Sequence, residues 1–379
     1  MNRKLYLIAV AVAVFTAPLM AQGNGAFPIA GVTLDSAGNL YGTTESGGAF
    51  GFGTVFKLFT SGVETVLYSF QGGTDGNEPE GGVILDSAGN LYGTTYQGGA
   101  YKMGTVFKVS VGGGETVLHS FPGGTDGANP NASLVFDSAG NLYGTTIGGG
   151  SASCIGGCGT VFKVSSTGEE AVLYAFTQTN DDGGHPNGAL IFDSAGNIYG
   201  TTQAGGANAD GTVFKLSSTN EETVLYSFKG GTDGQAPYDA LVQDSAGNLY
   251  GTTRYGGGTT NYGTIFRLSP KGVETVFSFK TITAGVNTFA GLVRDSAGNL
   301  YGTTPYGGVN ISGNVFKLSP GGKEILYSFK TQGDGNTPQG GVIRDSEGNL
   351  YGTTEQGGNG FGTVFKISAT GKETILYSF

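Results

Sequence analysis

Hydrophobic and polar positions along this chain form short apolar runs separated by glycine-rich polar turns. One complete unit of the pattern contains four runs, called runs A to D below: Gly82–Leu85, Leu91–Thr95, Gly104–Val109 and Glu115–Phe121. Each run is rich in Val, Leu, Thr, Phe and Tyr and is bounded by Gly, Asp, Asn or Ser, as β-strands are. No run extends a 3.6-residue apolar period, so the pattern predicts strands and almost no helix.

The turn between runs A and B is the most regular part of the unit. It reads Asp-Ser-Ala-Gly-Asn and leads into Leu-Tyr-Gly-Thr-Thr, as in Asp86–Thr95. The Asp side chain can cap its own turn, and Gly and Asn tolerate positive φ. Gly93 inside run B marks a place where we expect another backbone to approach closely. The turn asparagine recurs at intervals of 50 or 51 residues, with one interval of 56: Asn39, Asn90, Asn141, Asn197, Asn248, Asn299 and Asn349.

Four antiparallel strands in ~50 residues, repeated seven times, predict an all-β fold, a seven-bladed β-propeller over residues 31–379. A parallel β-helix is the alternative repeat architecture, but its coils are shorter and lack these hairpins. Small residues precede run A, as at Gly81 and Gly82, so we expect run A to be innermost, where seven strands crowd the axis. In that phase no strand is left over to complete a shared blade. With run B innermost, the first run A would instead clasp the last blade.

The first residues, 1–21, are typical of a signal peptide. Arg3 and Lys4 precede an uncharged apolar run, and small residues allow cleavage after Ala21. Because a membrane helix needs ~20 apolar residues, the shorter run predicts no membrane span in the mature chain. A retained anchor is the alternative. Residues 22–30 are predicted to be a linker, and the mature protein is expected to be secreted or to lie in the periplasm or cell envelope.

Composition supports this class of protein. The chain has 73 glycines and 11 prolines without a Gly-X-Y period, which excludes collagen and fits a glycine-rich, turn-rich β protein. Removing Arg3 and Lys4 leaves 17 of the 19 basic residues against 29 acidic ones, a formal charge of −12. Nucleic acid as a partner is therefore disfavoured, because it requires basic surfaces.

The two cysteines, Cys154 and Cys158, stand in the sequence Cys-Ile-Gly-Gly-Cys. In an exported protein we expect them to form a local disulfide, with free thiols as the alternative. Two thiols without a neighbouring His fall short of the four ligands of a structural zinc site. No metal site is predicted here.

The repeat also resembles a known family. The segments Asp-Ser-Ala-Gly-Asn-Leu-Tyr-Gly-Thr-Thr, Gly-Thr-Val-Phe-Lys and Glu-Thr-Val-Leu-Tyr-Ser-Phe are similar to those of the choice-of-anchor tandem repeat GloVer-containing proteins, over residues ~31–379. The resemblance implies an exported bacterial β-propeller of unknown biochemical role, often with a C-terminal surface anchor. The sequence departs from that pattern at Phe379, where no sorting tail follows.

One face of such a propeller carries the D-to-A and B-to-C loops, which vary in length and content. Variable loops on a rigid scaffold usually carry function, and carboxylates mixed with aromatic rings suit the hydroxyls and apolar face of a sugar. We therefore expect a binding scaffold for a carbohydrate or another surface protein. The candidate ligand-binding residues are Asp75, Tyr96, Tyr101, Asp126, Asp182, His185, Asp233, Tyr255, Tyr262, Tyr306 and Asp334. The competing interpretation is that the Asp-Gly pairs are turn chemistry and the rings cap blades.

Enzymatic alternatives rest on few residues. His119 replaces the tyrosine of run D in one copy, which favours a packed or edge position over catalysis. His185, in a D-to-A loop, is a weak catalytic candidate for a polysaccharide lyase or hydrolase on the same face. No set of nucleophile, base and orienting residue stands out, so an enzyme is the weaker interpretation.

Cofactor and assembly predictions are correspondingly modest. A ring of Asp residues offers oxygen ligands to calcium, but no segment resembles a dedicated calcium loop, and residues 281–289 lack the Asp. No cofactor is predicted, with calcium as the weak alternative. We expect a monomer. A purely structural repeat protein without a small ligand is the third functional alternative.

Overall fold

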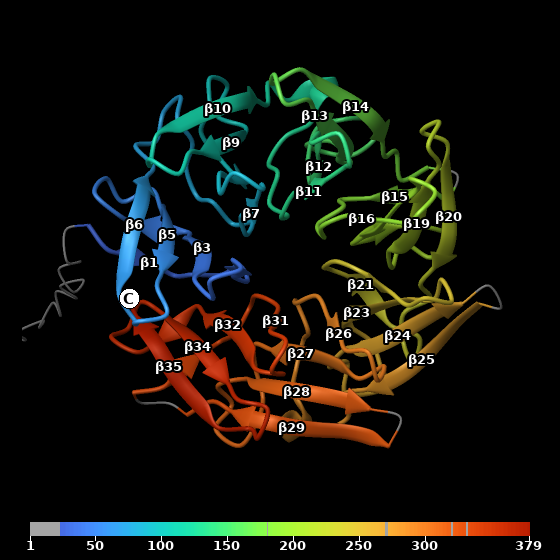
Figure 1. The fold of residues 1–379 in the computed structure, drawn as a ribbon. Helices are drawn as coiled ribbons and strands as arrows, with labels where there is room; N and C mark the ends of the chain where they lie inside the picture. The colour runs from blue at the N-terminus through green and yellow to red at the C-terminus, as the bar shows by residue number, and fades with distance from the viewer. Residues whose placement is uncertain (1–22, 180, 270–271, 320, 331–332) are drawn as a thin grey trace, which may run out of the picture.

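A computed structural model describes residues 23–179, 181–269, 272–319, 321–330 and 333–379. Seven four-stranded antiparallel sheets stand in a ring around a central axis (Figure 1). This confirms the predicted all-β, seven-bladed propeller. The predicted signal peptide, residues 1–21, lies outside the described residues. Gly25–Ala26, within the predicted linker 22–30, forms strand β1.

Each blade consists of runs A to D in chain order. The strand that forms within run A has two residues in every blade. Blades 1 to 3 contain β2 (Thr33–Leu34), β3 (Leu40–Thr44), β5 (Thr54–Leu58), β6 (Glu64–Ser69); β7 (Ile84–Leu85), β8 (Leu91–Thr95), β9 (Thr105–Val109), β10 (Glu115–Ser120); and β11 (Val135–Phe136), β12 (Leu142–Thr146), β13 (Thr160–Val164), β14 (Glu170–Ala175). Blades 4 and 5 contain β16 (Ile191–Phe192), β17 (Ile198–Thr202), β19 (Thr212–Leu216), β20 (Glu222–Ser227); and β22 (Val242–Gln243), β23 (Leu249–Tyr255), β24 (Thr264–Ser269), β25 (Gly272–Ser278).

Blades 6 and 7 complete the ring. They contain β26 (Val293–Arg294), β27 (Leu300–Thr304), β28 (Asn314–Ser319), β29 (Gly322–Ser328); and β31 (Ile343–Arg344), β32 (Leu350–Thr354), β34 (Thr363–Ile367), β35 (Glu373–Ser378). Short strands in the loops pair locally: β1 with β4 (Ser46–Gly47), β15 (Gly183–Gly184) with β18 (Ala204–Gly205), β30 (Gly335–Asn336) with β33 (Gln356–Gly357), and β21 (Gln235–Pro237) with β23. No helix in the described part of the chain is long and apolar enough to cross a membrane.

Run A is innermost, as its small residues predicted. The residues just before it meet their equivalents in the neighbouring blades around the axis. A Cβ atom on Gly82 would lie 3.1 Å from the carbonyl oxygen of Gly31, and one on Gly341 would lie 3.2 Å from that of Gly291. Larger side chains would therefore force the inner ends of the blades apart.

The ring closes without a shared blade. In the other blades, the D-to-A loop bonds back to the preceding blade, as the Glu78 amide does to Phe52 O at 3.2 Å. At the closure the N-terminal segment takes this part, because the Phe27 amide donates to Phe361 O at 2.8 Å. The Thr353 hydroxyl also donates to Ala30 O at 2.6 Å.

The core is a ring of phenylalanines. The Phe of run C is fully buried, and its ring covers the Gly of run B: a Cβ on Gly93 would lie 2.7 Å from Cζ of Phe107. The expectation that a backbone approaches this glycine was wrong, because an aromatic side chain does. The Phe that ends run D packs edge-on against the Phe of run C in the next blade, with 5.0 Å between the ring centroids of Phe70 and Phe107.

The A-to-B turn is held by its aspartate. One carboxylate oxygen of Asp86 accepts the amides of Ala88 and Asn90, and the other accepts Asn90 Nδ2 and the Tyr92 hydroxyl, at 2.8–3.1 Å. Burial would raise the pKa of this carboxyl, but the hydrogen bonds outweigh it and lower the pKa below its usual value. The predicted self-capping turn is therefore present, and it lies on the face opposite the variable loops.

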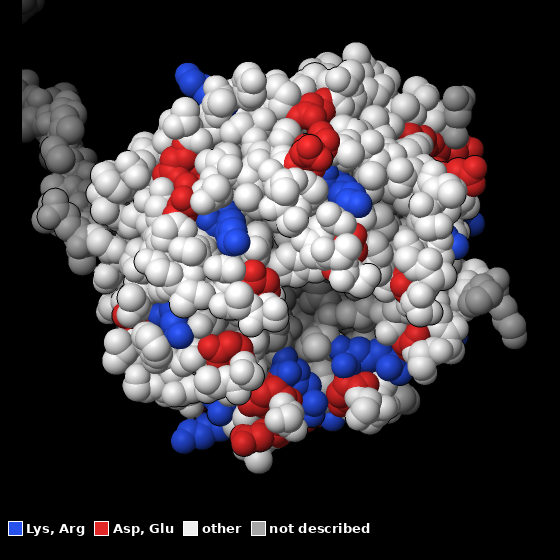
Figure 2. All heavy atoms as spheres, turned by 45° about the horizontal axis from the view of Figure 1, so that its top comes forward, with Lys and Arg blue, Asp and Glu red and all other residues white. Residues whose placement is uncertain are grey.

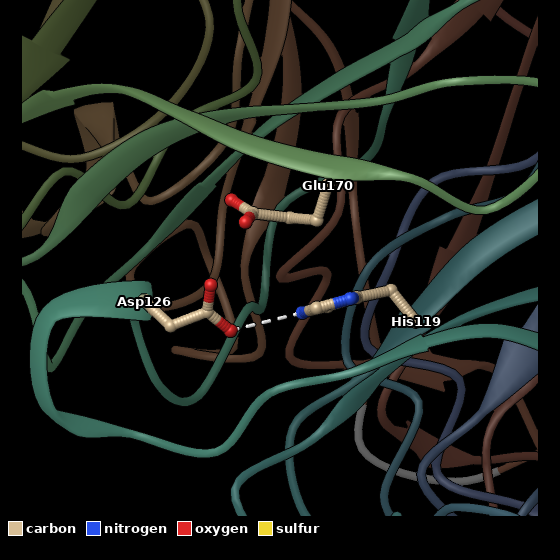
Figure 3. A group of neighbouring side chains, drawn as sticks. All are labelled: His119, Asp126 and Glu170. Atoms are coloured by element: carbon tan, nitrogen blue, oxygen red, sulfur yellow. Dashed lines mark hydrogen bonds and ion pairs between the residues drawn. The ribbon is translucent and has the colours of Figure 1, made fainter.

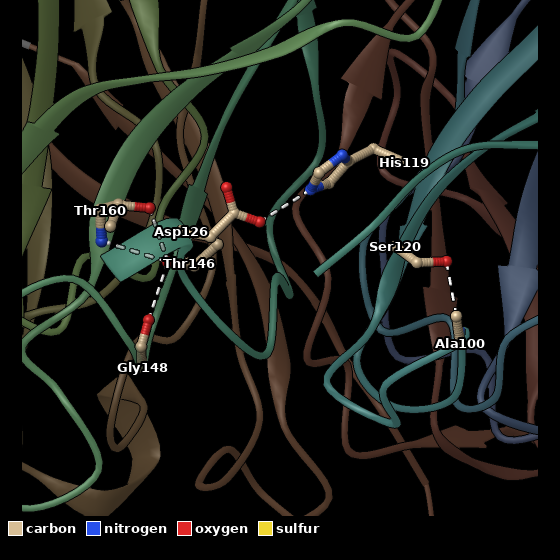
Figure 4. A network of polar contacts seen from close by, with 7 residues as sticks. All are labelled: Ala100, His119, Ser120, Asp126, Thr146, Gly148 and Thr160. Carbon is tan, nitrogen blue, oxygen red and sulfur yellow. Dashed lines mark hydrogen bonds and ion pairs between the residues drawn. The ribbon is translucent and has the colours of Figure 1, made fainter. Parts of the chain in front are cut away.

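Paired threonines join runs B and C at the loop end of the blade. Thr146 and Thr160, both buried, share a hydroxyl hydrogen bond at 2.8 Å, and Thr146 also donates to Gly148 O (Figure 4). Cys154 and Cys158 are joined by a disulfide in the long B-to-C loop of this blade. These hydrogen bonds hold the ends of runs B and C, between which the B-to-C loop extends.

Candidate functional site at the axial mouth

One residue from each of the six D-to-A loops, and one from the N-terminal segment that takes their place in blade 1, line a cavity of about 150 Å³ at the central axis. Each follows the proline of its segment, or Thr288 in one blade, and immediately precedes the small residues of the inner ring. These mouth residues are Ile29, Glu80, Asn131, Asn187, Tyr238, Phe289 and Gln339. Figure 2 shows a hollow at the centre of the ring, with acidic and basic side chains together on part of its rim. The scaffold is nearly seven-fold symmetric, but the mouth is not.

Backbone geometry aims each mouth residue at the axis. The residue before the proline, or before Thr288, has a positive φ in all seven segments, between 52° and 59°. In blade 2 this residue is Glu78, whose carbonyl accepts the Tyr96 amide at 2.8 Å. The Thr43 hydroxyl of the preceding blade donates to Gly81 O at 2.9 Å. Glu80 is therefore held on both sides by regular features of the repeat.

Glutamates gather on one side of the mouth. Burial raises the pKa of Glu80 to about 7, and the nearby carboxylates of Glu45 and Glu78 raise it further. Burial together with Glu78 and Glu355 raises the pKa of Glu45 as well. Glu355 Oε2 accepts a hydrogen bond from Gln339 Nε2 at 2.6 Å. This acidic side carries negative charge that the described side chains do not neutralise by an ion pair.

The opposite side is aromatic and contains one cation. The guanidinium carbon of Arg254 lies 4.4 Å from the ring centroid of Phe289, 5.0 Å from that of Tyr255 and 5.7 Å from that of Tyr238. Tyr306 lies 6.4 Å from Phe289, ring to ring, and is 43% exposed. These contacts are cation–π and edge-to-face arrangements, which fix the rings in place.

The two sides face each other across the cavity. Burial raises the pKa of Tyr96, and the charges of Glu80 and Glu78 add to this effect. The pKa of Tyr238 is also raised by burial, with a contribution from Glu80. Asp239 occupies a ring position that is Gly or Ala in the other blades, and burial raises its pKa although the amides of Ala240 and Gly291 donate to it. Acidic and aromatic side chains are therefore close together around the same small cavity.

Three of the predicted ligand-binding residues lie next to the residues of this mouth: Tyr96 near Glu80, Tyr255 beside Arg254 and Tyr306 beside Phe289. The predicted aspartates lie elsewhere, at the outer edge of the blades. Asp75 accepts the Tyr68 hydroxyl at 2.8 Å, and Asp233 and Asp334 accept Tyr226 and Tyr327 in the same way. Asp182 accepts the amide and hydroxyl of Thr177, and Asp126 pairs with His119. Their carboxylates support the loops, and a ligand role for them remains a prediction.

The remaining candidates do not converge. Tyr101 is 58% exposed, and Tyr262 packs against the core between blades 5 and 6. His185 has a positive φ of 55°, and its Nδ1 lies 3.0 Å from Ile147 O. Its equivalent Asn129 donates to Tyr96 O in the same manner, so the ring of His185 occupies a bonding position of the repeat. Among the described residues, it is His119 that pairs with a carboxylate, that of Asp126.

Sequence reasoning missed Glu80, Tyr238, Phe289 and Arg254. Each belongs to a segment next to run A or run B, which the pattern assigns to the scaffold. The signal that finds them is the difference among equivalent positions: the residue after the loop proline or Thr288 changes from blade to blade, and so does the residue that follows run B, where Arg254 stands.

Larger hollows lie on the opposite face. One of about 590 Å³ runs between blades 3 and 4 and is lined by Asp137, Tyr143, Lys163 and Asp193. These residue types stand at the same positions in nearly every blade. The hollow is therefore a feature of the repeat and does not single out one site.

Comparison with known proteins agrees with this architecture. The model of the Gloeobacter/Verrucomicrobia repeat family matches residues 9–195 and 185–379, nearly the whole chain. The chain belongs to this family. The resemblance inferred from the repeated motifs is thereby confirmed. No curated protein matches the chain.

Solved structures show the same fold at low sequence identity. The extracellular domain of a proposed one-component system from B. thetaiotaomicron is similar, with 11% identity and a TM-score of 0.58. The match covers 91% of this repeat-family chain but only 39% of that structure. A proposed 6-phosphogluconolactonase from Bacteroides uniformis has 14% identity and a TM-score of 0.58, with coverage of 89% and 95%. At such identities the likeness shows the fold alone.

Proposed function

We propose that this protein is an exported binding scaffold whose axial mouth takes one unit of a carbohydrate. The observation that carries the proposal is the asymmetry of the mouth. Seven nearly identical blades place different residues at equivalent positions around one cavity, with glutamates on one side and aromatic rings with Arg254 on the other. A purely structural repeat has no need of such a difference.

The chemistry of the cavity suits a sugar ring. A volume of about 150 Å³ is below the ~300 Å³ of typical drug-sized sites, so it matches one terminal unit of a glycan. Glu80 and Glu355 offer oxygens to sugar hydroxyls, while Tyr255 and Tyr306 offer ring surface to the apolar face. The negative charge of the glutamate side favours neutral or amino sugars over uronic acids.

The enzymatic alternative has less support. A lyase or hydrolase based on His185 needs a carboxylate or nucleophile beside that ring. The His185 ring instead contacts the backbone oxygen of Ile147. Export rests on the predicted signal peptide 1–21, and mass spectrometry of the mature protein after expression in a secreting host should show cleavage after Ala21.

The binding proposal is tested with the mature chain on a panel of neutral, amino and uronic glycans, followed by calorimetry with the best ligand. Replacing Tyr96, Tyr255 and Tyr306 together by Ala should weaken binding by at least ~10-fold. Glu80→Gln should reduce the preference for amino over neutral sugars. Tyr101→Ala, an exposed ring on the same face, is the matched control and should leave binding unchanged.

Other results would overturn the proposal. Glycan binding that survives the triple replacement would place the ligand elsewhere. Capture of a surface protein without any glycan binding would replace carbohydrate by protein as the ligand class. Turnover on the glycan panel that His185→Ala abolishes would favour the enzyme.

A further inference from the structure

Three metal-ligating side chains meet at the outer junction of blades 2 and 3. His119 comes from β10, Asp126 from the 3₁₀ turn Gly124–Asp126 that follows it, and Glu170 from the start of β14 (Figure 3). His119 Nε2 lies 3.0 Å from Asp126 Oδ2, and one ligand atom from each of the three residues lies within 4.8 Å of the others. This cluster is separate from the axial mouth.

The other blades show what is unusual about this junction. At the equivalent place five of them have a tyrosine, as in Tyr68 with Asp75 and Glu115, or Tyr327 with Asp334 and Glu373, and blade 5 has Phe277. Burial and the hydrogen bond to the aspartate raise the pKa of Tyr68 and Tyr327 above the ordinary value. Those phenols therefore keep their protons and are poor ligands. His119 alone places a nitrogen lone pair at this position.

A second departure from the repeat stands three residues further on. In other blades the amide of the residue after the run D phenylalanine donates to the loop aspartate, as Lys229 does to Asp233 at 2.9 Å and Lys330 to Asp334 at 2.8 Å. In blade 2 that residue is Pro122, which has no N–H. Asp126 thus lacks a backbone donor that its equivalents have, and its oxygens keep free lone pairs.

We propose that His119, Asp126 and Glu170 bind a divalent first-row transition ion, with zinc as the best match. Zinc takes imidazole nitrogen and carboxylate oxygen at ~2.0–2.2 Å, so neighbouring ligand atoms lie roughly 3–3.5 Å apart in a tetrahedral site. The His119–Asp126 separation of 3.0 Å already fits, and a Glu170 oxygen within 4.8 Å of both other ligand atoms has to move closer to complete the set. The imidazole disfavours calcium and magnesium, which prefer all-oxygen sites.

The surroundings leave the site both fixed and accessible. The His119 ring packs edge-on against Phe121 with centroids 4.7 Å apart. The Ala100 amide donates a hydrogen bond to Ser120 Oγ, and Thr146 and Thr160 share one between their hydroxyls, so the elements on either side are held in place (Figure 4). The side chains of His119 and Asp126 are 17% and 22% exposed, which leaves room for a water ligand. Glu170 Oε1 is buried and has no hydrogen-bond partner among the described residues, a state it shares with the equivalent glutamates of four other blades.

The test is calorimetric titration of the mature chain with zinc chloride, backed by cobalt absorption spectra. Wild type should bind one ion per chain. His119→Tyr restores the residue of the other blades and should weaken binding by more than ~10-fold, the lower bound for perturbing even an outer-shell group. His185→Asn should bind like wild type. The double replacement of Tyr68 by His and Gln71 by Pro copies the junction into blade 1 beside Glu115 and should add a second ion.

Circular dichroism before each titration shows that the variants fold, and zinc should raise the thermal midpoint of wild type but not of His119→Tyr. The proposal is overturned if wild type retains no zinc at millimolar concentration. It is equally overturned if His119→Tyr binds as tightly as wild type, or if His185→Asn abolishes binding.

Discussion

At the scale of single residues, each blade depends on a glycine that lies under an aromatic ring. Gly93 of β8 faces Phe107 of β9 across the strand pair, and any Cβ there meets the ring at 2.7 Å. Gly93→Ala should therefore destabilise the fold by ~1–3 kcal/mol through overpacking. Gly112→Ala, at an exposed turn with open space around it, should change stability by less than ~0.5 kcal/mol. Urea unfolding of both variants measures the difference, and equal midpoints would contradict this account.

Single residues were also where sequence reasoning was weakest. The glycine was recognised as a close-approach position, but its partner could not be named, because the ring that covers it lies in another strand. Tyr96, Tyr255 and Tyr306 were found because they are large residues in loops that vary. Tyr238 and Phe289 were missed because they stand 51 residues apart in the chain and touch only through the curvature of the ring, with centroids 5.4 Å apart.

At the scale of elements, the A-to-B hairpin owes its regularity to one carboxylate. Asp86 accepts four hydrogen bonds within its own turn and strand. Asp86→Ala leaves Tyr92 and two amides without this acceptor. It should lower the free energy of unfolding by ~1–3 kcal/mol. Ser87→Ala, in the same turn but exposed, should be nearly neutral. Chemical denaturation compares the two, and a similar loss for both would show that the turn is held by its backbone alone.

The elements themselves were predictable because seven copies repeat one local pattern. Strand order, hairpin turns and the inner place of run A follow from residue types that are nearly the same in every unit. The outer aspartates were harder to interpret, since Asp75 and Asp233 read as exposed loop carboxylates in the sequence. Only the structure shows that strand D turns a tyrosine toward each of them.

At the scale of the whole molecule, repeated carboxyls give stability an unusual dependence on pH. Burial raises the pKa of Glu115, Glu222 and Glu373 to about 7, and a neighbouring loop aspartate contributes in each case. The folded state then binds more protons than the unfolded state between pH ~4.5 and ~7, so stability falls as pH rises through that window. The turn aspartates act below it: their pKa is lowered, and their contribution is lost as pH falls below ~3.8.

The thermal midpoint should therefore be higher at pH 5 than at pH 8. Glu115→Gln copies the protonated form and should reduce the difference, whereas Glu169→Gln, at an exposed position of blade 3, should not. Calorimetric scans at both pH values test this. A midpoint that rises from pH 5 to pH 8 in the wild type would show that the strand D glutamates do not govern stability.

Ring closure is the other property of the whole molecule. The same phenylalanine contact joins every pair of blades, with 5.1 Å between Phe228 and Phe266 and also between Phe379 and Phe56. Replacing either Phe228 or Phe379 by Ala should lower the free energy of unfolding by ~3–5 kcal/mol.

At the Phe228 interface, however, the chain itself links the two blades, whereas blades 7 and 1 are held only by non-covalent contacts. Hydrogen exchange in Phe379→Ala should therefore rise in β3, β5, β34 and β35 far above the rest, because the ring opens there first. Phe228→Ala should raise exchange in blades 4 and 5 without exposing the closure. An equal pattern in both variants would mean that the ring opens at no preferred interface, and that the Phe27 and Thr353 hydrogen bonds fasten the closure as firmly as a peptide chain does.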